Sequence, residues 1–191
     1  MLELKLFLES LHPISNATWE DVQKLFTTAI LKKGSLFAED GKVCRDFAFL
    51  KTGIVRGFYR TEQGSEYIKQ FFTPNSIIGG YTSLITGKPN FIIQEALTDC
   101  TVCVANYAAF IKLYDDHPDL ERVGRIFAER YFVEKERKEI DTILYDADKR
   151  YELFKLKFPQ MEQHVPQYHI ASYLGISATQ LSRIRKKLRR G

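Results

Sequence analysis

Residues 167–188 read QYHIASYLGISATQLSRIRKKL and predict two short helices that cross at a tight turn. Ala171 is the small residue that such a crossing needs on the first helix, and Gly175, four positions later, tolerates positive φ in the turn. Ser177 can cap the second helix directly after the turn. Apolar residues spaced to pin the helices together are Ile170, Leu174, Ile176, Leu181, Ile184 and Leu188. The stretch is typical of a helix-turn-helix.

The outer face of the second helix is predicted to be small, polar and basic. Small hydrogen-bonding side chains near a helix N-terminus suit base edges in the major groove, and Arg or Lys further along suit bases and phosphates. Arg183 is the best candidate for a bidentate contact with guanine. Phosphate contacts or simply solvated charge are expected for Arg185, Lys187, Arg189 and Arg190. The residues predicted to contact DNA are Gln167, Ser177, Ala178, Thr179, Gln180, Ser182, Arg183, Lys186 and Lys187.

The distribution of charge along the chain favours the same prediction. The 191 residues hold 28 Lys and Arg against 24 Asp and Glu, a mild formal charge of +4. The last carboxylate is Glu162, and the six basic residues beyond it fall on or directly after the second helix of the motif. Such a concentration of positive charge indicates nucleic-acid binding. The simpler alternative is a helical hairpin with a solvated basic face.

The N-terminal region predicts one helix over residues 16–33. Thr18 can cap it, with Asp21 three positions later in a capping-box arrangement. Apolar residues then recur at helical spacing, and Lys-Lys-Gly at 32–34 is a typical helix end. Charge interrupts the preceding stretch MLELKLFLES, so we expect neither a signal peptide nor a membrane span.

Residues 35–105 predict an antiparallel β-sandwich or barrel. Short runs rich in Val, Ile, Phe, Tyr and Thr are separated by glycine-containing turns, among them Gly53 and Gly64. The clearest strands cover residues 47–50, 54–59 and 67–72. Helical stretches follow this β unit, so the fold class is α+β with segregated elements.

Residues 118–146 predict a long helix that begins with a proline in its first turn. Apolar residues recur along it every seven positions, with two arginines at intervening positions of the same seam. The residues of this pattern are Ile126, Arg130, Val133, Arg137, Ile140 and Leu144. The pattern favours a two-stranded dimer seam, and a helix packed on its own β domain is the alternative. Shorter helices are predicted at 107–114 and 149–158, with a proline-bracketed connector at 159–166.

A β unit, a long helix, a connector and a C-terminal helix-turn-helix together resemble the Crp/Fnr family of bacterial transcription regulators. The most specific local match is IASYLGIS at 170–177, followed by LSRI at 181–184. The resemblance implies a double-stranded, jelly-roll-like β-roll of the cyclic-nucleotide-binding type at residues 1–117. It implies a dimerisation helix at 118–146 and a winged helix-turn-helix at 147–191. It also implies a homodimer bound to a palindromic operator in double-stranded DNA, with RNA polymerase as a candidate partner.

The effector pocket that the resemblance implies departs from the family's nucleotide-binding pattern. Gly80 stands where nucleotide-binding members have a glutamate, and Asn90 stands where they have an arginine for the cyclic phosphate. A charge-assisted bidentate phosphate contact is therefore absent. On the long helix, Lys135 and Glu136 replace small hydroxyl residues that would meet the base. Cyclic AMP is not the expected effector, and the pocket residues carried over are Gly79, Gly80, Ser83, Leu84, Asn90, Lys135 and Glu136.

We expect no metal, iron–sulfur cluster, haem or other cofactor, and no enzymatic activity. The oxygen-sensing branch of the family needs N-terminal cysteines, and residues 1–43 contain none. Cys100 and Cys103 form a C-x-x-C, but residues three apart in a strand face opposite sides, which favours buried thiols over a zinc or redox site. Residues 35–105 lack histidine, which argues against a metal-binding cupin. The chain also lacks nucleophile-elbow, P-loop and dinucleotide-binding motifs.

The sequence therefore predicts a cytoplasmic, homodimeric, sequence-specific DNA-binding transcription regulator without membrane association. Three cysteines are too few for a disulfide framework and favour a reducing compartment. The alternative is a ligand-binding sensory β-roll whose C-terminal helical hairpin docks a protein partner.

Overall fold

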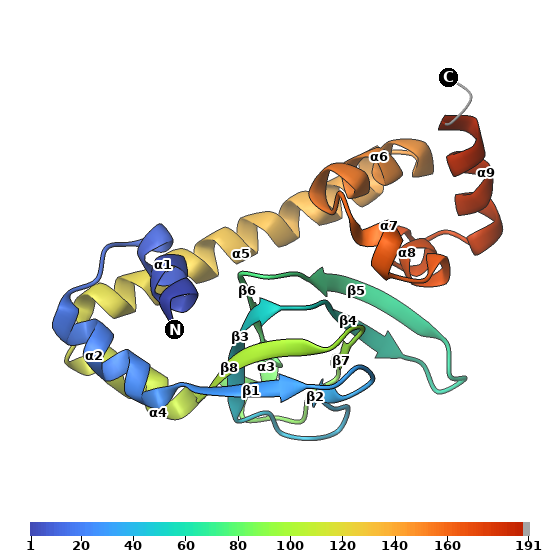
Figure 1. Cartoon of the computed structure of the whole chain (residues 1–191). Coiled ribbons are helices and arrows are strands. Elements are labelled where there is room, and N and C mark those ends of the chain that lie inside the picture. Colours follow the sequence, from blue (N-terminus) through green and yellow to red (C-terminus); the bar gives the residue numbers. More distant parts are fainter. Residues whose placement is uncertain (189–191) are drawn as a thin grey trace.

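The computed structural model describes residues 1–188, which form a β-sandwich flanked by helices (Figure 1). The strands are β1 (Thr27–Leu31), β2 (Leu36–Ala38), β3 (Asp46–Thr52), β4 (Val55–Arg60), β5 (Glu66–Phe72), β6 (Ser76–Ile78), β7 (Ile93–Ala96) and β8 (Cys100–Asn106). The helices are α1 (Leu2–Leu11), α2 (Asn16–Leu25), α3 (Tyr81–Thr86), α4 (Tyr107–Lys112) with a 3-10 turn at Leu113–Asp115, α5 (Pro118–Leu144), α6 (Ala147–Lys157), α7 (Met161–His164), α8 (Gln167–Leu174) and α9 (Ala178–Leu188).

Two four-stranded antiparallel sheets make the sandwich. Their strand orders are β1-β8-β3-β6 and β2-β7-β4-β5. Large side chains of adjacent strands fill the interior, with Phe49 and Phe58 both fully buried. Gly53 joins β3 to β4 at a φ of 93°, and a Cβ added there would lie 2.5 Å from the Sγ of Cys100. The predicted α+β class and antiparallel sandwich are confirmed.

The helix predicted over residues 16–33 is wrong beyond residue 25. α2 ends at Leu25, and β1 follows, paired antiparallel with β8 from Thr27 opposite Val104 to Leu31 opposite Cys100. Short apolar runs fit a strand as well as a helix, and here the long-range pairing with β8 decides between them. The lysines and glycine at 32–34 form a turn instead of a helix end, with Gly34 at a φ of 85°.

The N-cap of α2 also differs from the prediction, because Ser15 caps the helix in place of Thr18. The amide of Thr18 donates to the Ser15 Oγ over 3.1 Å. The buried Thr18 hydroxyl instead donates to Asp119 at 2.8 Å and lies 3.2 Å from Nδ1 of His117. Thr18 therefore ties α2 to the first turn of α5.

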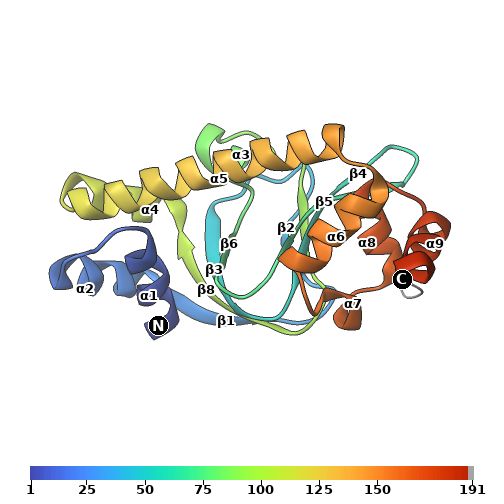
Figure 2. The same ribbon diagram turned by 90° about the horizontal axis from the view of Figure 1, so that it is seen from above.

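The long helix α5 runs along one side of the β-sandwich, from the N-terminal helices to the C-terminal ones (Figures 1 and 2). Its bounds, Pro118–Leu144, agree closely with the predicted 118–146. Leu120 and Val123 near its start are buried against α1, α4 and β3. Its C-terminal half is largely exposed in the single chain.

The C-terminal helices share one hydrophobic core with the sheet that holds β4, β5 and β7. The ring of Phe71 in β5 lies 5.3 Å from that of Tyr173 in α8 and 6.0 Å from that of Phe158. The connector predicted at 159–166 contains the short helix α7. Within residues 1–188 no strand follows β8, so a wing is not among the described elements.

Candidate nucleic-acid interface and effector pocket

The helices α8 and α9 have the local geometry that the sequence predicts for a helix-turn-helix. Ala171 is buried where the helices meet, and Gly175 ends α8 in the left-handed conformation at a φ of 67°. The amide of Ile176 donates to the carbonyl of Ala171 at 3.0 Å, which closes the turn. The inward-facing pins of α9, Leu181 and Ile184, are buried.

The start of α9 is fixed by a reciprocal cap. The amide of Gln180 donates to the Ser177 Oγ over 3.1 Å, and the Ser177 amide donates to the Gln180 Oε1 over 3.0 Å. This is the capping-box pattern, which satisfies two backbone donors at a helix N-terminus. Ser177 is therefore a cap, as predicted, and the Gln180 side chain is engaged in the same cap.

The residues predicted to contact DNA are all exposed in the described chain. Leu181 and Ile184 turn inward, and the polar and basic side chains between them turn outward. The exposed residues are Gln167, Ser177, Ala178, Thr179, Gln180, Ser182, Arg183, Lys186 and Lys187. α9 lies at one end of the molecule, away from α1 and α2 (Figure 2).

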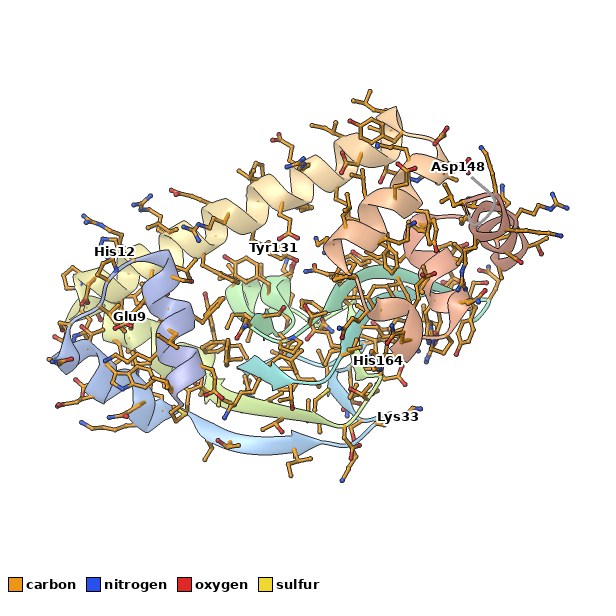
Figure 3. All side chains as sticks on the ribbon, turned by 45° about the horizontal axis from the view of Figure 1, so that its top comes forward. Glu9, His12, Lys33, Tyr131, Asp148 and His164 are labelled. Carbon is orange, nitrogen blue, oxygen red and sulfur yellow. The ribbon has the colours of Figure 1, made fainter. Side chains whose placement is uncertain are left out.

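Two of the predicted phosphate-contacting cations have partners within the protein. The Arg185 Nε lies 3.2 Å from Glu162, which also accepts a hydrogen bond from the Tyr151 hydroxyl. A phosphate contact or a simply solvated charge was predicted for Arg185, and the structure instead shows it in an ion pair. Lys187 pairs with Asp148 at 2.5 Å, and Asp148 is labelled beside α9 in Figure 3. Arg189 and Arg190 lie outside the described residues.

A cavity of about 690 Å³ lies between α5, α1 and the β-sandwich. Of the predicted pocket residues, Gly79, Leu84, Asn90 and Lys135 line it. The other predicted pocket residues, Gly80, Ser83 and Glu136, are not among its lining residues, and Glu136 is exposed on α5. The structure thus brings together four of the predicted pocket residues and leaves out three.

The polar groups of the loop that would correspond to a phosphate-binding segment are hydrogen-bonded within the protein. The Asn90 amide nitrogen donates to the carbonyls of Ile92 and Glu39 at 2.6 and 3.2 Å, and its oxygen accepts from the Ile92 amide at 3.3 Å. Gln94 binds both backbone groups of Gly79, accepting from its amide at 2.8 Å and donating to its carbonyl at 2.9 Å. Asn90 and the Gly79 amide are therefore occupied within the protein.

Gly80 and Ser83 also have structural roles in this segment. A Cβ on Gly80 would lie 2.6 Å from Sγ of Cys44 and 2.8 Å from Oδ1 of Asn90. The buried Ser83 hydroxyl donates to the carbonyl of Lys88 at 2.5 Å and accepts from the Cys44 amide at 2.9 Å. The glycine allows close packing of the loop, and the serine fixes α3 to the strand connections.

Many aromatic side chains line the cavity, and they were not predicted from the sequence. Phe127 and Tyr131 stack along α5 with ring centroids 6.3 Å apart, and Tyr81 of α3 lies 6.5 Å from Tyr131. Figure 3 shows Tyr131 pointing from α5 towards α3, and its hydroxyl donates to the Gln70 Oε1 at 3.2 Å. The four-residue spacing of Phe127 and Tyr131, which places both rings on one face of the helix, was the sequence pattern that could have predicted them.

Two lysines are the charged groups at the cavity. Lys69 of β5 and Lys135 of α5 both line it. Burial lowers the pKa of Lys69, and the positive charge of Lys135 lowers it further. Lys138, one turn along α5, donates to the carbonyl of Lys69 and lies 3.9 Å from the ring centroid of Tyr173 in α8. Burial, with repulsion from Lys157 and Lys69, lowers the pKa of Lys138 to about 8.

The predicted dimer seam of α5 is mostly exposed. Val133 is 61% exposed, Ile140 46% and Leu144 68%, while Ile126 is partly buried. Arg130 and Arg137 are also exposed. If the helix packed only on its own domain, these apolar side chains would be buried against the β-sandwich. In the single chain they are not.

The structure also bears on the cysteines, on metal binding and on membrane-spanning helices. Cys100 and Cys103 are buried in different core clusters, so the prediction of buried thiols is confirmed. Residues 1–188 bring together no group of three or more His, Cys, Asp or Glu side chains able to hold a metal. Within the same range, no helix has both the length and the apolar character of a membrane span.

The comparisons with known proteins place the fold. Residues 29–117 match the family model of the cyclic nucleotide-binding domain. No curated protein matches the chain. One similar solved structure is a putative transcriptional regulator of the Crp/Fnr family from Eubacterium rectale, 17% identical, with a TM-score of 0.70 over 92% of this chain and 84% of that one.

Two further structures are similar over most of their length. FixK2 from Bradyrhizobium japonicum is 18% identical, with a TM-score of 0.69 over 86% of this chain and 85% of that one. The c-di-GMP-responsive global regulator CLP of Xanthomonas campestris is 19% identical, with a TM-score of 0.69 over 92% of each chain. Identities this low establish a shared fold, and the functions of these proteins remain their own.

Proposed function

We propose that the chain is a sequence-specific DNA-binding transcription regulator of the Crp/Fnr type, with residues 1–117 as a sensor domain, 118–146 as a dimerisation helix and 147–191 as the DNA-binding part. The observation that carries this is the outer face of α9. It is exposed and carries small, polar and basic side chains, on a helix that a tight Gly175 turn holds against α8. Action in the cytoplasm and contact with RNA polymerase belong to the same proposal.

A salt titration of DNA binding tests this proposal. Duplexes selected from a random pool would be bound by the full chain at increasing salt, with fluorescence anisotropy as the readout. A regulator that neutralises phosphates loses affinity with a log–log slope of about −0.9 for each phosphate contacted. Indifference to both DNA and salt would reject the proposal in favour of a sensory module whose helical hairpin docks a protein.

Arg183→Ala tests which residue reads sequence. If Arg183 contacts guanine, its loss costs about 1–3 kcal/mol and relaxes specificity at one operator position. Lys88→Ala is the charge-matched control, because Lys88 is exposed on the loop after α3, and α3 lies apart from α9 (Figures 1 and 2). An equal loss of affinity for every sequence would make Arg183 a phosphate contact instead.

We infer a homodimer formed through α5, because the exposed apolar residues of its seam lie at two-stranded coiled-coil spacing. Ile140→Glu should shift the chain from dimer to monomer in sedimentation equilibrium, since a buried unpaired carboxylate is costly. Leu156→Glu is the control, because Leu156 is 80% exposed on α6, outside the seam. A dimer that survives Ile140→Glu would contradict this interface.

A further inference from the structure

The cavity has an unusual charge pattern for its size. Its volume of about 690 Å³ falls in the range of sites for drug-sized molecules. Among the described residues that line it, Lys69 and Lys135 carry positive charge, and neither Asp nor Glu occurs. A carboxylate does stand nearby, because Glu139 pairs with Lys135 at 3.8 Å. The lining itself thus presents two cations and no anion to a ligand.

Most of the remaining lining residues are apolar or aromatic. They include Phe7 and Leu11 of α1, Phe110 of α4 and Phe127 of α5. Phe7 and Phe127 are in edge-to-face contact, with centroids 6.3 Å apart. Such walls favour a flat, aromatic ligand body, because aromatic rings stack well on one another.

The polar groups of the strand connections cannot take the charge of a ligand. Asn90 already makes three hydrogen bonds with backbone groups, and Gln94 occupies both backbone groups of Gly79. A cyclic phosphate placed there would have to break these bonds without gaining an arginine. The anionic group of a ligand therefore belongs near the lysines of β5 and α5.

We propose that this cavity binds an organic anion with an aromatic body that is not a cyclic nucleotide, its charged group placed between Lys69 and Lys135. An anionic group there would also offset the repulsion between the two ammonium groups, which lowers the pKa of Lys69 in addition to the larger effect of burial. The binding itself does not depend on the proposed function. Only the role of the ligand as an effector rests on that function.

The position of this anion site suits an effector. The ammonium group of Lys138 donates to the Lys69 carbonyl and lies over the ring of Tyr173 in α8 as a cation–π contact. A ligand bound to Lys69 would therefore be linked to α8 through two successive contacts, Lys69 with Lys138 and Lys138 with Tyr173. An effector acts because its affinity differs between two arrangements of the protein. The contacts between Lys69, Lys138 and Tyr173 are a place where two such arrangements can differ.

Two probes that differ by one charged group test the proposal. The anion 8-anilinonaphthalene-1-sulfonate and its neutral counterpart N-phenyl-1-naphthylamine share the same fused and single rings. Both would be titrated into the full chain with fluorescence as the readout. The sulfonate should bind at least tenfold more tightly than the neutral probe, because hydrogen bonds to charged groups are the strong ones. Cyclic AMP should not displace it.

Variants locate the binding. Lys69→Gln and Lys135→Gln should each remove most of the difference in affinity between the sulfonate and the neutral probe, and the affinity of the neutral probe should not change. Lys51→Gln is the control, because Lys51 lies on β3 outside the cavity lining, and it should change the affinity of neither probe. Ala128→Phe adds a ring to the lining and should weaken both probes. Equal binding of both probes, unchanged binding in the lysine variants, or displacement by cyclic AMP would overturn the proposal. If the unmodified chain binds the sulfonate probe as expected but does not bind DNA, only the proposed function is overturned.

Discussion

Gly53 and Gly64 have similar backbone angles and very different surroundings. Their φ angles are 93° and 81°, but a Cβ on Gly53 would lie 2.5 Å from Sγ of Cys100, whereas one on Gly64 would meet nothing within 4 Å. Gly64→Ala should cost about 1–2 kcal/mol, the strain of a left-handed residue. Gly53→Ala should cost about 1–3 kcal/mol more because of steric overlap. Urea unfolding measures both, and equal losses would mean that the β3–β4 turn shifts freely.

Residue roles were predictable where neighbours in sequence determine them. Gly175 and Ser177 act through backbone groups within four positions, so their roles follow from the local pattern. Asn90 was predicted to be a pocket residue and does line the cavity, but its hydrogen bond to the carbonyl of Glu39, 51 positions away, was not predicted. A side chain whose partners lie on distant loops gives no sign of that in the sequence.

At the scale of elements, one side chain of α8 hydrogen-bonds to the backbone of β5. The Ser172 hydroxyl accepts from the Ile68 amide at 3.0 Å and donates to the Glu66 carbonyl at 3.1 Å. Ser172→Ala leaves both backbone groups without this partner and should cost about 1–3 kcal/mol of unfolding free energy. Ser182→Ala, an exposed change on α9, is the control. A similar loss in both variants in urea unfolding would show that the bond to β5 contributes nothing of its own.

Elements were predictable where periodicity was long and failed where it was short. α5 holds its pattern over many turns, and its predicted bounds agree with the structure within about two residues. The run at 27–31 is only five residues long and became a strand because β8 offered a free edge. Local spacing alone does not contain that pairing.

At the scale of the whole molecule, the cavity and the docking of the C-terminal helices were beyond prediction. The cavity draws its lining from α1, α3, α4, α5 and several strands, so it exists only after the chain has folded. The core shared by β5, α6 and α8 likewise joins segments about 100 positions apart. The distribution of charge predicts DNA binding by the C-terminal end, but it could not show that this end packs on the sheet that holds β4, β5 and β7.

That packing includes a buried histidine whose charge state is fixed by its neighbours. Nδ1 of His169 in α8 accepts from the Arg56 guanidinium at 3.2 Å, and Arg56 also pairs with Glu66 and Glu95 at 2.5 Å each. Burial, and next the charge of Arg56, lowers the pKa of His169 to about 4, although the two glutamates act in the opposite direction. The folded chain therefore holds His169 neutral at pH 7.

The consequence for stability has a definite sign. The unfolded chain takes up a proton on this histidine near pH 6.5, whereas the folded chain does so only near pH 4. Between these values the unfolded state binds more protons, so the free energy of unfolding should fall as the pH is lowered, by at most about 1.4 kcal/mol per pH unit. His169→Gln keeps an acceptor for Arg56 but does not titrate, so it should lose less stability over the same window. Parallel urea unfolding curves of both proteins from pH 7 to 4 measure the difference, and identical pH dependence would show that docking of α8 on the sheet does not hold His169 neutral.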